Sequence, residues 1–124
     1  MTVVRRADSR RSATPNAVMT THASPTQGGS AIAVWRVEMA PGAAGPLHTF
    51  DVEQVWTALE GGATVHLDGE PTTVGPGDTI VMPAGAPRRV QAGPEQGFVA
   101  VVAAPAEARA SVPGGEAVVP AWIA

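Results

Sequence analysis

Short runs of alternating apolar and polar residues, each ended by a glycine or proline turn, limit most strongly what this chain can fold into. In the run 31–39, for example, Trp35, Val37 and Met39 share one parity. Period-two alternation predicts a strand with one buried face. The expected strands cover 31–39, 53–60, 63–70, 72–74, 78–82, 88–93 and 97–104. Strands this short and this regularly spaced are typical of an all-β sandwich or barrel.

The chain length and the segments that flank these strands predict one domain with two extensions. A chain of 124 residues suits a single core. We expect an N-terminal arm over 1–30, a barrel over 31–105, and a tail over 106–124 whose apolar end docks in part. The arm could supply a strand to a second subunit, because small sheets leave edges that need cover. The sequence therefore predicts a homodimer.

Composition excludes several classes of function. The chain has no cysteine and no lysine, so thiolate metal sites, disulfides and Schiff-base chemistry are excluded. A net charge of -3 and an aromatic content of 4% do not favour binding to nucleic acid or to an anionic membrane. No apolar run approaches the roughly 20 residues of a membrane span, and the N-terminus lacks the apolar region of a secretory signal. We therefore expect a cytoplasmic protein without nucleic-acid or membrane partners.

Two stretches carry a family resemblance. They read "PGAAGPLHTFDVEQVWTALEGG" over 41–62 and "VGPGDTIVMPAGAPRRV" over 74–90. Their glycine and proline framework resembles the two motifs of the cupin superfamily, and the likeness extends over about residues 32–103. The resemblance implies a jelly-roll barrel, also called a double-stranded β-helix, with a ligand pocket inside and a dimeric assembly.

The metal-binding positions of that family are largely lost here. Metal-binding cupins place two histidines and a glutamate in the first motif and a third histidine in the second. The matching residues are His48, Phe50, Gln54 and Arg88, and only His48 keeps the family's identity. Phe50 has no lone pair, Gln54 is a weak neutral ligand, and a guanidinium about 5 Å from a dication would repel it by about 6–7 kcal/mol.

We therefore expect no metal or other cofactor. If a metal binds, His48 and Gln54 are its weak candidate ligands, and a site that uses His22 or His66 stays open. His66 lies on the polar side of its strand, which predicts an exposed side chain.

Without a metal, the predicted pocket contains side chains that suit acid–base chemistry. Because side chains alternate along a strand, positions 48, 50, 54 and 56 share the inward face. His48 could act as general acid or base, Arg88 could hold a carboxylate or an enolate oxygen, and Gln54 could orient either partner. These three are the catalytic candidates. The expected apolar wall that binds the substrate consists of Phe50, Trp56, Met82 and Phe98.

Structural roles for the same side chains are the alternative. His48 could be a barrel histidine that is hydrogen-bonded to Gln54, and Arg88 could form an ion pair with Asp51 or Glu53. Buried polar groups are costly unless they are paired, so three of them in one barrel exceed what packing requires.

Three functions remain open. The leading hypothesis is a metal-independent isomerase or cyclase that acts on a small oxygenated, polyketide-like substrate of secondary metabolism by His/Arg acid–base chemistry. The second is a sensor or carrier of a small ligand without turnover. The third is a metal-dependent cupin with an altered ligand shell, a lyase or dioxygenase.

Overall fold

The computed structural model describes residues 1–124 and consists almost entirely of strands. One 3-10 turn, η1 (Arg6–Asp8), is the only helical element, and no helix is long and apolar enough to cross a membrane. The strands are β1 (Arg10–Ala13), β2 (Val18–Ala23), β3 (Ile32–Met39), β4 (Thr49–Phe50), β5 (Gln54–Gly61), β6 (Ala63–Leu67), β7 (Glu70–Val74), β8 (Thr79–Met82), β9 (Arg88–Ala92), β10 (Phe98–Pro105) and β11 (Ala110–Ser111). The expected all-β fold is confirmed.

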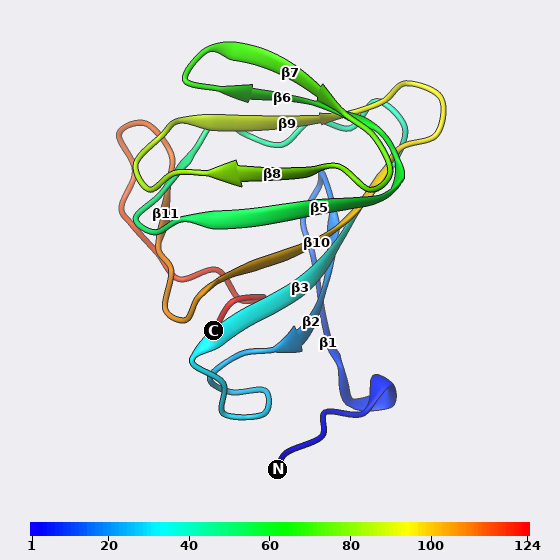
Figure 1. Ribbon diagram of the computed structural model, residues 1–124. Coiled ribbons are helices and arrows are strands. Elements are labelled where there is room, and N and C mark those ends of the chain that lie inside the picture. The colour runs from blue at the N-terminus through cyan, green and yellow to red at the C-terminus, as the bar shows by residue number, and fades with distance from the viewer.

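The strands form two facing layers (Figure 1). The larger sheet has the antiparallel order β1-β2-β3-β10-β5-β8. The smaller one has the order β7-β6-β9, and the bridges Ala44–Gln91 and His48–Arg88 join the segment before β4 to its edge. Pairing of β4 with β11 then attaches the C-terminal segment to the same layer. This arrangement is a jelly-roll barrel with an open mouth.

The inner face of each strand follows the alternation in the sequence. In β3, Trp35, Val37 and Met39 are buried, as their shared parity predicts. The central strand β10 lies between β3 and β5, and Ala100 and Val102 on its inner face are fully buried. The packed core thus lies between the layers.

The N-terminal 30 residues contribute two strands to the larger sheet of their own chain. β2 pairs with β3, and β1 pairs with β2 as the outermost strand. Met19 and Thr21 in β2 are buried, so this segment packs on the core rather than lying free. Exchange of the segment with a second subunit, and the homodimer, stay predictions.

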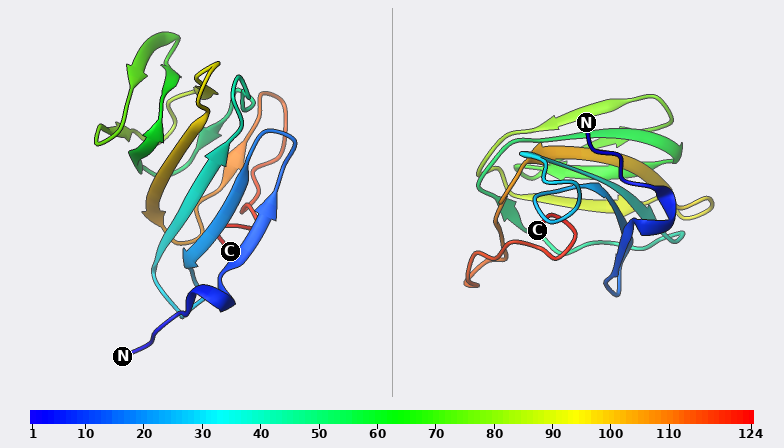
Figure 2. Two further views of the ribbon diagram at one scale, coloured as in Figure 1. Left: turned by 90° about the vertical axis from the view of Figure 1, so that its right-hand side faces the viewer. Right: turned by 90° about the horizontal axis from the view of Figure 1, so that it is seen from below.

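The C-terminal segment returns to lie beside β1 and β2 (Figure 2). The main-chain oxygen of Ala124 accepts hydrogen bonds from Arg10 Nη2 at 2.7 Å and from Ser24 Oγ at 2.6 Å. Thr21 Oγ1 donates to the carbonyl oxygen of Trp122, and Ile123 is fully buried. The end of the tail is therefore docked on the barrel next to its mouth.

Two glycines allow the close approach of two turns at the opposite end of the barrel. Gly61 has φ +66° and Gly97 has φ +70°, a backbone region that favours glycine. The N–H of Gly62 donates to the carbonyl oxygen of Gly97 at 3.1 Å. A Cβ on Gly61 would collide with that same carbonyl oxygen, whereas a Cβ on Gly69, φ +80°, would meet nothing within 4 Å.

This contrast predicts that Gly61→Ala destabilises the protein more than Gly69→Ala. Both changes place alanine in the left-handed region, which costs about 1–2 kcal/mol. Gly61→Ala adds a main-chain collision, which as overpacking costs roughly 1–3 kcal/mol more. Urea unfolding of both variants measures the difference, and equal free energies of unfolding would contradict this account of the turn.

Candidate functional site

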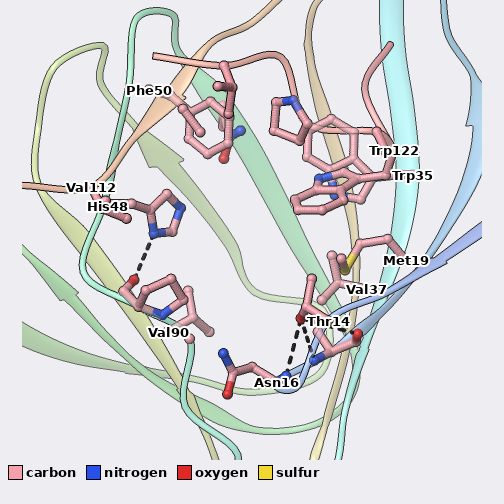
Figure 3. Close-up of a pocket in the computed structure, with 18 of the residues that line it drawn as sticks. Thr14, Asn16, Met19, Trp35, Val37, His48, Phe50, Val90, Val112 and Trp122 are labelled. Carbon is pink, nitrogen blue, oxygen red and sulfur yellow. Dashed lines mark hydrogen bonds between the residues drawn. The ribbon is translucent and has the colours of Figure 1, made fainter. Parts of the chain in front are cut away.

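A cavity of about 620 Å³ opens at the mouth of the barrel (Figure 3). Its 24 lining residues, 14 of them hydrophobic, come from the β1–β2 turn, β3, the segment around β4, β5, β9 and the C-terminal tail. The tail and the β1–β2 turn, which lie far apart in the sequence, thus form part of the wall. The size and the lining suit a small, largely apolar organic ligand.

Most of the aromatic side chains of the chain gather here. The chain has three tryptophans, two phenylalanines and no tyrosine. Trp35, Phe50, Trp56 and Trp122 all line the cavity. Trp122 was not among the residues expected from the sequence, because the stretch "AWIA" indicates only an apolar end and not where that end docks.

His48 lies in the wall with one ring nitrogen already engaged. Its Nδ1 is 2.8 Å from the carbonyl oxygen of Pro46, which can only accept. The neutral ring therefore carries its proton on Nδ1, and Nε2 keeps a lone pair on the side away from Pro46 (Figure 3). The ring also packs edge-on against Phe50, with 5.3 Å between centroids. The hydrogen-bond partner expected for His48 as a structural residue, Gln54, is not the one it has.

Burial is the main reason that the pKa of His48 lies below its ordinary value of 6.5. The hydrogen bond to Pro46 opposes this shift, and the positive charge of Arg88 adds to it. His48 is therefore neutral at neutral pH and is available as a base. Among the lining residues, Glu116 is the only other titratable group, and it is exposed in the tail.

Gln54 and Trp56 are two residues apart on β5, and both face the cavity. The indole N–H of Trp56 donates to Gln54 Oε1 at 3.0 Å. Gln54 is fully buried, and its Nε2 has no hydrogen-bond partner. Phe50 is also buried in the wall, so the shared inward face of positions 48, 50, 54 and 56 is found in the structure.

Arg88 faces inward but does not line the cavity, contrary to the expectation that it would hold a ligand there. Its Nε donates to the carbonyl oxygen of Ala86 at 3.1 Å and its Nη2 to that of Pro83 at 2.7 Å. The guanidinium carbon lies 5.6 Å from the centre of the Phe50 ring. Burial lowers the pKa of Arg88, and the carboxylate of Asp68 opposes that shift.

The expected ion pairs of Arg88 are absent, because the only ion pair of the structure joins Arg36 and Glu38. Asp51 instead accepts a hydrogen bond from the main-chain N–H of Arg109 at 2.8 Å and so helps to position the tail.

Two residues expected in the apolar wall lie elsewhere. Met82 and Phe98 are buried in the core and do not line the cavity. The other histidines are also remote from it: His22 is exposed on β2, and His66 on β6 is half-buried rather than exposed, with its Nδ1 unpartnered. Parity places a side chain on a face, but it does not give which inward side chains border the cavity and which pack in the core.

The residues at the family's metal positions do not fit a metal ion. No group of three or more histidine, aspartate or glutamate side chains is close enough to hold one. Gln54 Oε1 already accepts a hydrogen bond from Trp56, and the other polar atom of the amide is a donor, which cannot bind a cation. His48 offers the one strong ligand atom, and a single imidazole beside a weak neutral amide oxygen does not make a metal site.

Comparison with known families gives one clear match. The family model described as Cupin domain matches residues 35–103. No curated protein matches the sequence.

Several solved structures are similar. The polyketide cyclase RemF from Streptomyces resistomycificus is 26% identical, with a TM-score of 0.75, and the match covers 87% of this chain and 81% of that one. Rru_A2000 from Rhodospirillum rubrum, a cupin-2 domain, is 15% identical with a TM-score of 0.78, over 88% and 78% of the two chains. The DMSP lyase DddQ from Ruegeria pomeroyi is 22% identical with a TM-score of 0.74, over 89% and 64%. The last two likenesses show the fold alone.

The geometry predicts that His48 titrates below 6.5 in the folded protein. Between the folded and the unfolded pKa the unfolded chain binds more protons, so His48 makes the fold more stable as the pH rises through this window. NMR titration of the ring proton shifts measures the pKa, and in urea the value returns to about 6.5. A folded-state pKa at or above 6.5 would contradict the burial of this ring.

Proposed function

The chain belongs to the cupin family, and we propose that it is an enzyme that moves a proton on a small, polyketide-like carbonyl compound without a metal. Isomerisation and intramolecular cyclisation are the reactions that this chemistry serves. The observation that carries the proposal is an apolar cavity of about 620 Å³ in which a half-buried, neutral histidine is the one titratable side chain of the lining that is not exposed.

The apolar wall supplies binding for a ring or a hydrocarbon chain. Trp35 and Trp122 lie near each other on one side of the cavity, and His48 lies across from them (Figure 3). Burial of a ligand between them removes water from around His48, and electrostatic interactions strengthen in such a site.

The proposed step begins at His48 Nε2, which takes a proton from the carbon next to a carbonyl group. The C–H electron pair becomes an enolate, and the ring becomes an imidazolium that keeps its Nδ1–H bond to Pro46. The enolate carbon then attacks a second carbonyl carbon of the same molecule, which forms a C–C bond and an alkoxide. The imidazolium returns the proton to the alkoxide oxygen, so atoms balance and no oxidant or reductant is consumed.

Two comparisons support this proposal. The chain is 26% identical to a polyketide cyclase over 87% of its length. The solved structures that resemble it are mostly enzymes, among them a lyase and a dioxygenase. The residues at the metal positions favour the metal-independent form of the reaction over the lyase and dioxygenase alternative, because His48 is the one strong ligand among them.

We expect the protein to accelerate hydrogen–deuterium exchange at the carbon next to the carbonyl of 2-tetralone, a bicyclic ketone. His48→Gln removes the base and lowers the exchange rate about a hundredfold or more, the usual contribution of a general base. His22→Gln, on the exposed outer face of β2, leaves the rate unchanged. In the wild type the rate rises with pH through the depressed pKa of His48 and is level at neutral pH. Proton NMR in D₂O measures all three.

Tight binding of such ketones with no exchange above the buffer rate would overturn the enzymatic proposal in favour of a carrier or sensor.

The exchange rate should be unaffected by removal of metal ions. Prolonged dialysis against EDTA leaves it unchanged, because Gln54 offers beside His48 only a weak neutral oxygen that already accepts from Trp56, and Arg88 offers no lone pair. Elemental analysis of the protein as purified, read together with the rate after dialysis, provides the measurement. A loss of activity that stoichiometric manganese, iron, nickel or zinc restores would contradict the metal-independent mechanism.

A further inference from the structure

Gln54 is a lining residue of the cavity with an unpartnered donor, and the hydrogen bond from Trp56 fixes the orientation of its amide. An indole N–H can only donate, so the hydrogen bond from Trp56 Nε1 requires the amide oxygen of Gln54 on that side. The NH₂ group is then the part of the amide that does not bond to Trp56. It is fully buried and has no partner within the protein, although Gln54 lines the cavity. An unpaired buried donor is costly, which points to a partner supplied by the ligand.

We propose that Gln54 Nε2 donates to the oxygen of a neutral carbonyl ligand, so that the cavity selects ketones over carboxylic acids. The inference rests on the proposed function in one respect, because it names the substrate class of the same site. It concerns binding, and it therefore has consequences that do not require turnover.

The charges around the cavity argue for a neutral ligand. No lysine or arginine is among its lining residues. Arg88, the cation that the sequence places nearest, donates to the carbonyl oxygens of Ala86 and Pro83 and is covered by the Phe50 ring. The one charged residue of the lining is the acidic Glu116. A carboxylate that entered this cavity would lose its hydration without gaining a cation, and that transfer is strongly unfavourable.

The same donor suits the charge that develops during reaction. When His48 removes the proton next to a carbonyl group, negative charge moves onto the carbonyl oxygen. An amide N–H aimed at that oxygen stabilises the enolate more than the ketone, because the acceptor becomes charged. Gln54 thereby has a role opposite to that of a metal ligand at the same position: it donates to an anion rather than accepting a cation.

The test compares three ligands with the same naphthalene ring. They are 2-acetonaphthone, a neutral ketone, 2-ethylnaphthalene, which has nearly the same shape but no acceptor, and 2-naphthoate, a carboxylate. Equilibrium dialysis at pH 7.5 gives the dissociation constants. For the wild type we expect the ketone to bind about three- to tenfold more tightly than the hydrocarbon, as one neutral hydrogen bond supplies. We expect the carboxylate to bind at least about tenfold more weakly than the ketone.

Gln54→Met keeps a side chain of similar length and removes the donor. The preference for the ketone over the hydrocarbon then falls to within twofold, while binding of the hydrocarbon is retained. The matched control is Gln91→Met on the exposed face of β9, which leaves all three constants unchanged. Thermal unfolding of each variant confirms that it is folded.

Trp56→Phe provides the second variant, because it retains Gln54 and an aromatic ring and removes the indole N–H that orients the amide. Binding of 2-ethylnaphthalene to this variant controls for the smaller ring. The freed amide can turn, so the ketone preference falls at least twofold. This variant carries the test if Gln54→Met does not fold.

Binding of 2-naphthoate as tightly as 2-acetonaphthone would overturn the inference, and so would a ketone preference that persists in Gln54→Met. The failure of the proposed function has a different signature. Loss of the ketone preference in Gln54→Met without any deuterium exchange in the wild type refutes the proton-transfer enzyme and leaves the ketone selectivity standing. Deuterium exchange that depends on His48, without a ketone preference in binding, refutes the ketone selectivity and leaves the proton-transfer enzyme standing.

Discussion

The main-chain pairing of His48 with Arg88 is the constraint on which the site depends. The N–H of each residue donates to the carbonyl oxygen of the other, at 3.0 and 2.9 Å. This bridge joins the segment before β4 to β9, and so it attaches the first motif to the smaller sheet and closes one side of the mouth. Directly paired residues of an antiparallel ladder point to the same face, so both side chains enter the barrel.

Phe50 separates the two side chains that this bridge brings together. Its ring packs edge-on against His48 and lies 5.6 Å from the guanidinium carbon of Arg88. Nε and Nη2 of the guanidinium donate to the main-chain carbonyls of Ala86 and Pro83, and Nη1 is buried without a partner. The guanidinium charge still lowers the pKa of His48, after the larger effect of burial. Phe50, at a position where metal-binding cupins have a ligand, therefore contacts both the neutral histidine of the cavity wall and the buried cation behind it.

The sequence predicted the parts of the site that depend on local geometry. Period-two alternation places His48, Phe50, Gln54 and Trp56 on the inward face, and the structure shows all four in the cavity wall. It could not predict which inward side chains border the cavity, because parity carries no information on how the two sheets pack against each other.

Contacts between distant segments were also beyond the reach of the sequence. Met82 pairs in register with Gln54 across β8 and β5, yet it packs into the core instead of the cavity. Trp122 reaches the cavity because Thr21, Ser24 and Arg10 hold the last residues against β1 and β2. These contacts span about 100 positions in the chain, and no local pattern encodes them.

Two residues on one strand explain why the pocket offers a hydrogen-bond donor at position 54, where metal-binding cupins offer a ligand for a cation. Positions 54 and 56 both face inward because side chains alternate along β5, and this spacing brings an indole N–H to the amide oxygen of Gln54. A glutamate at position 54 would offer that indole one oxygen and keep a second for a cation. The amide offers the same oxygen and leaves a donor. A change of one oxygen to an NH₂ group, held in place by Trp56, thus reverses the charge that this part of the barrel favours, while the backbone that positions it needs no change.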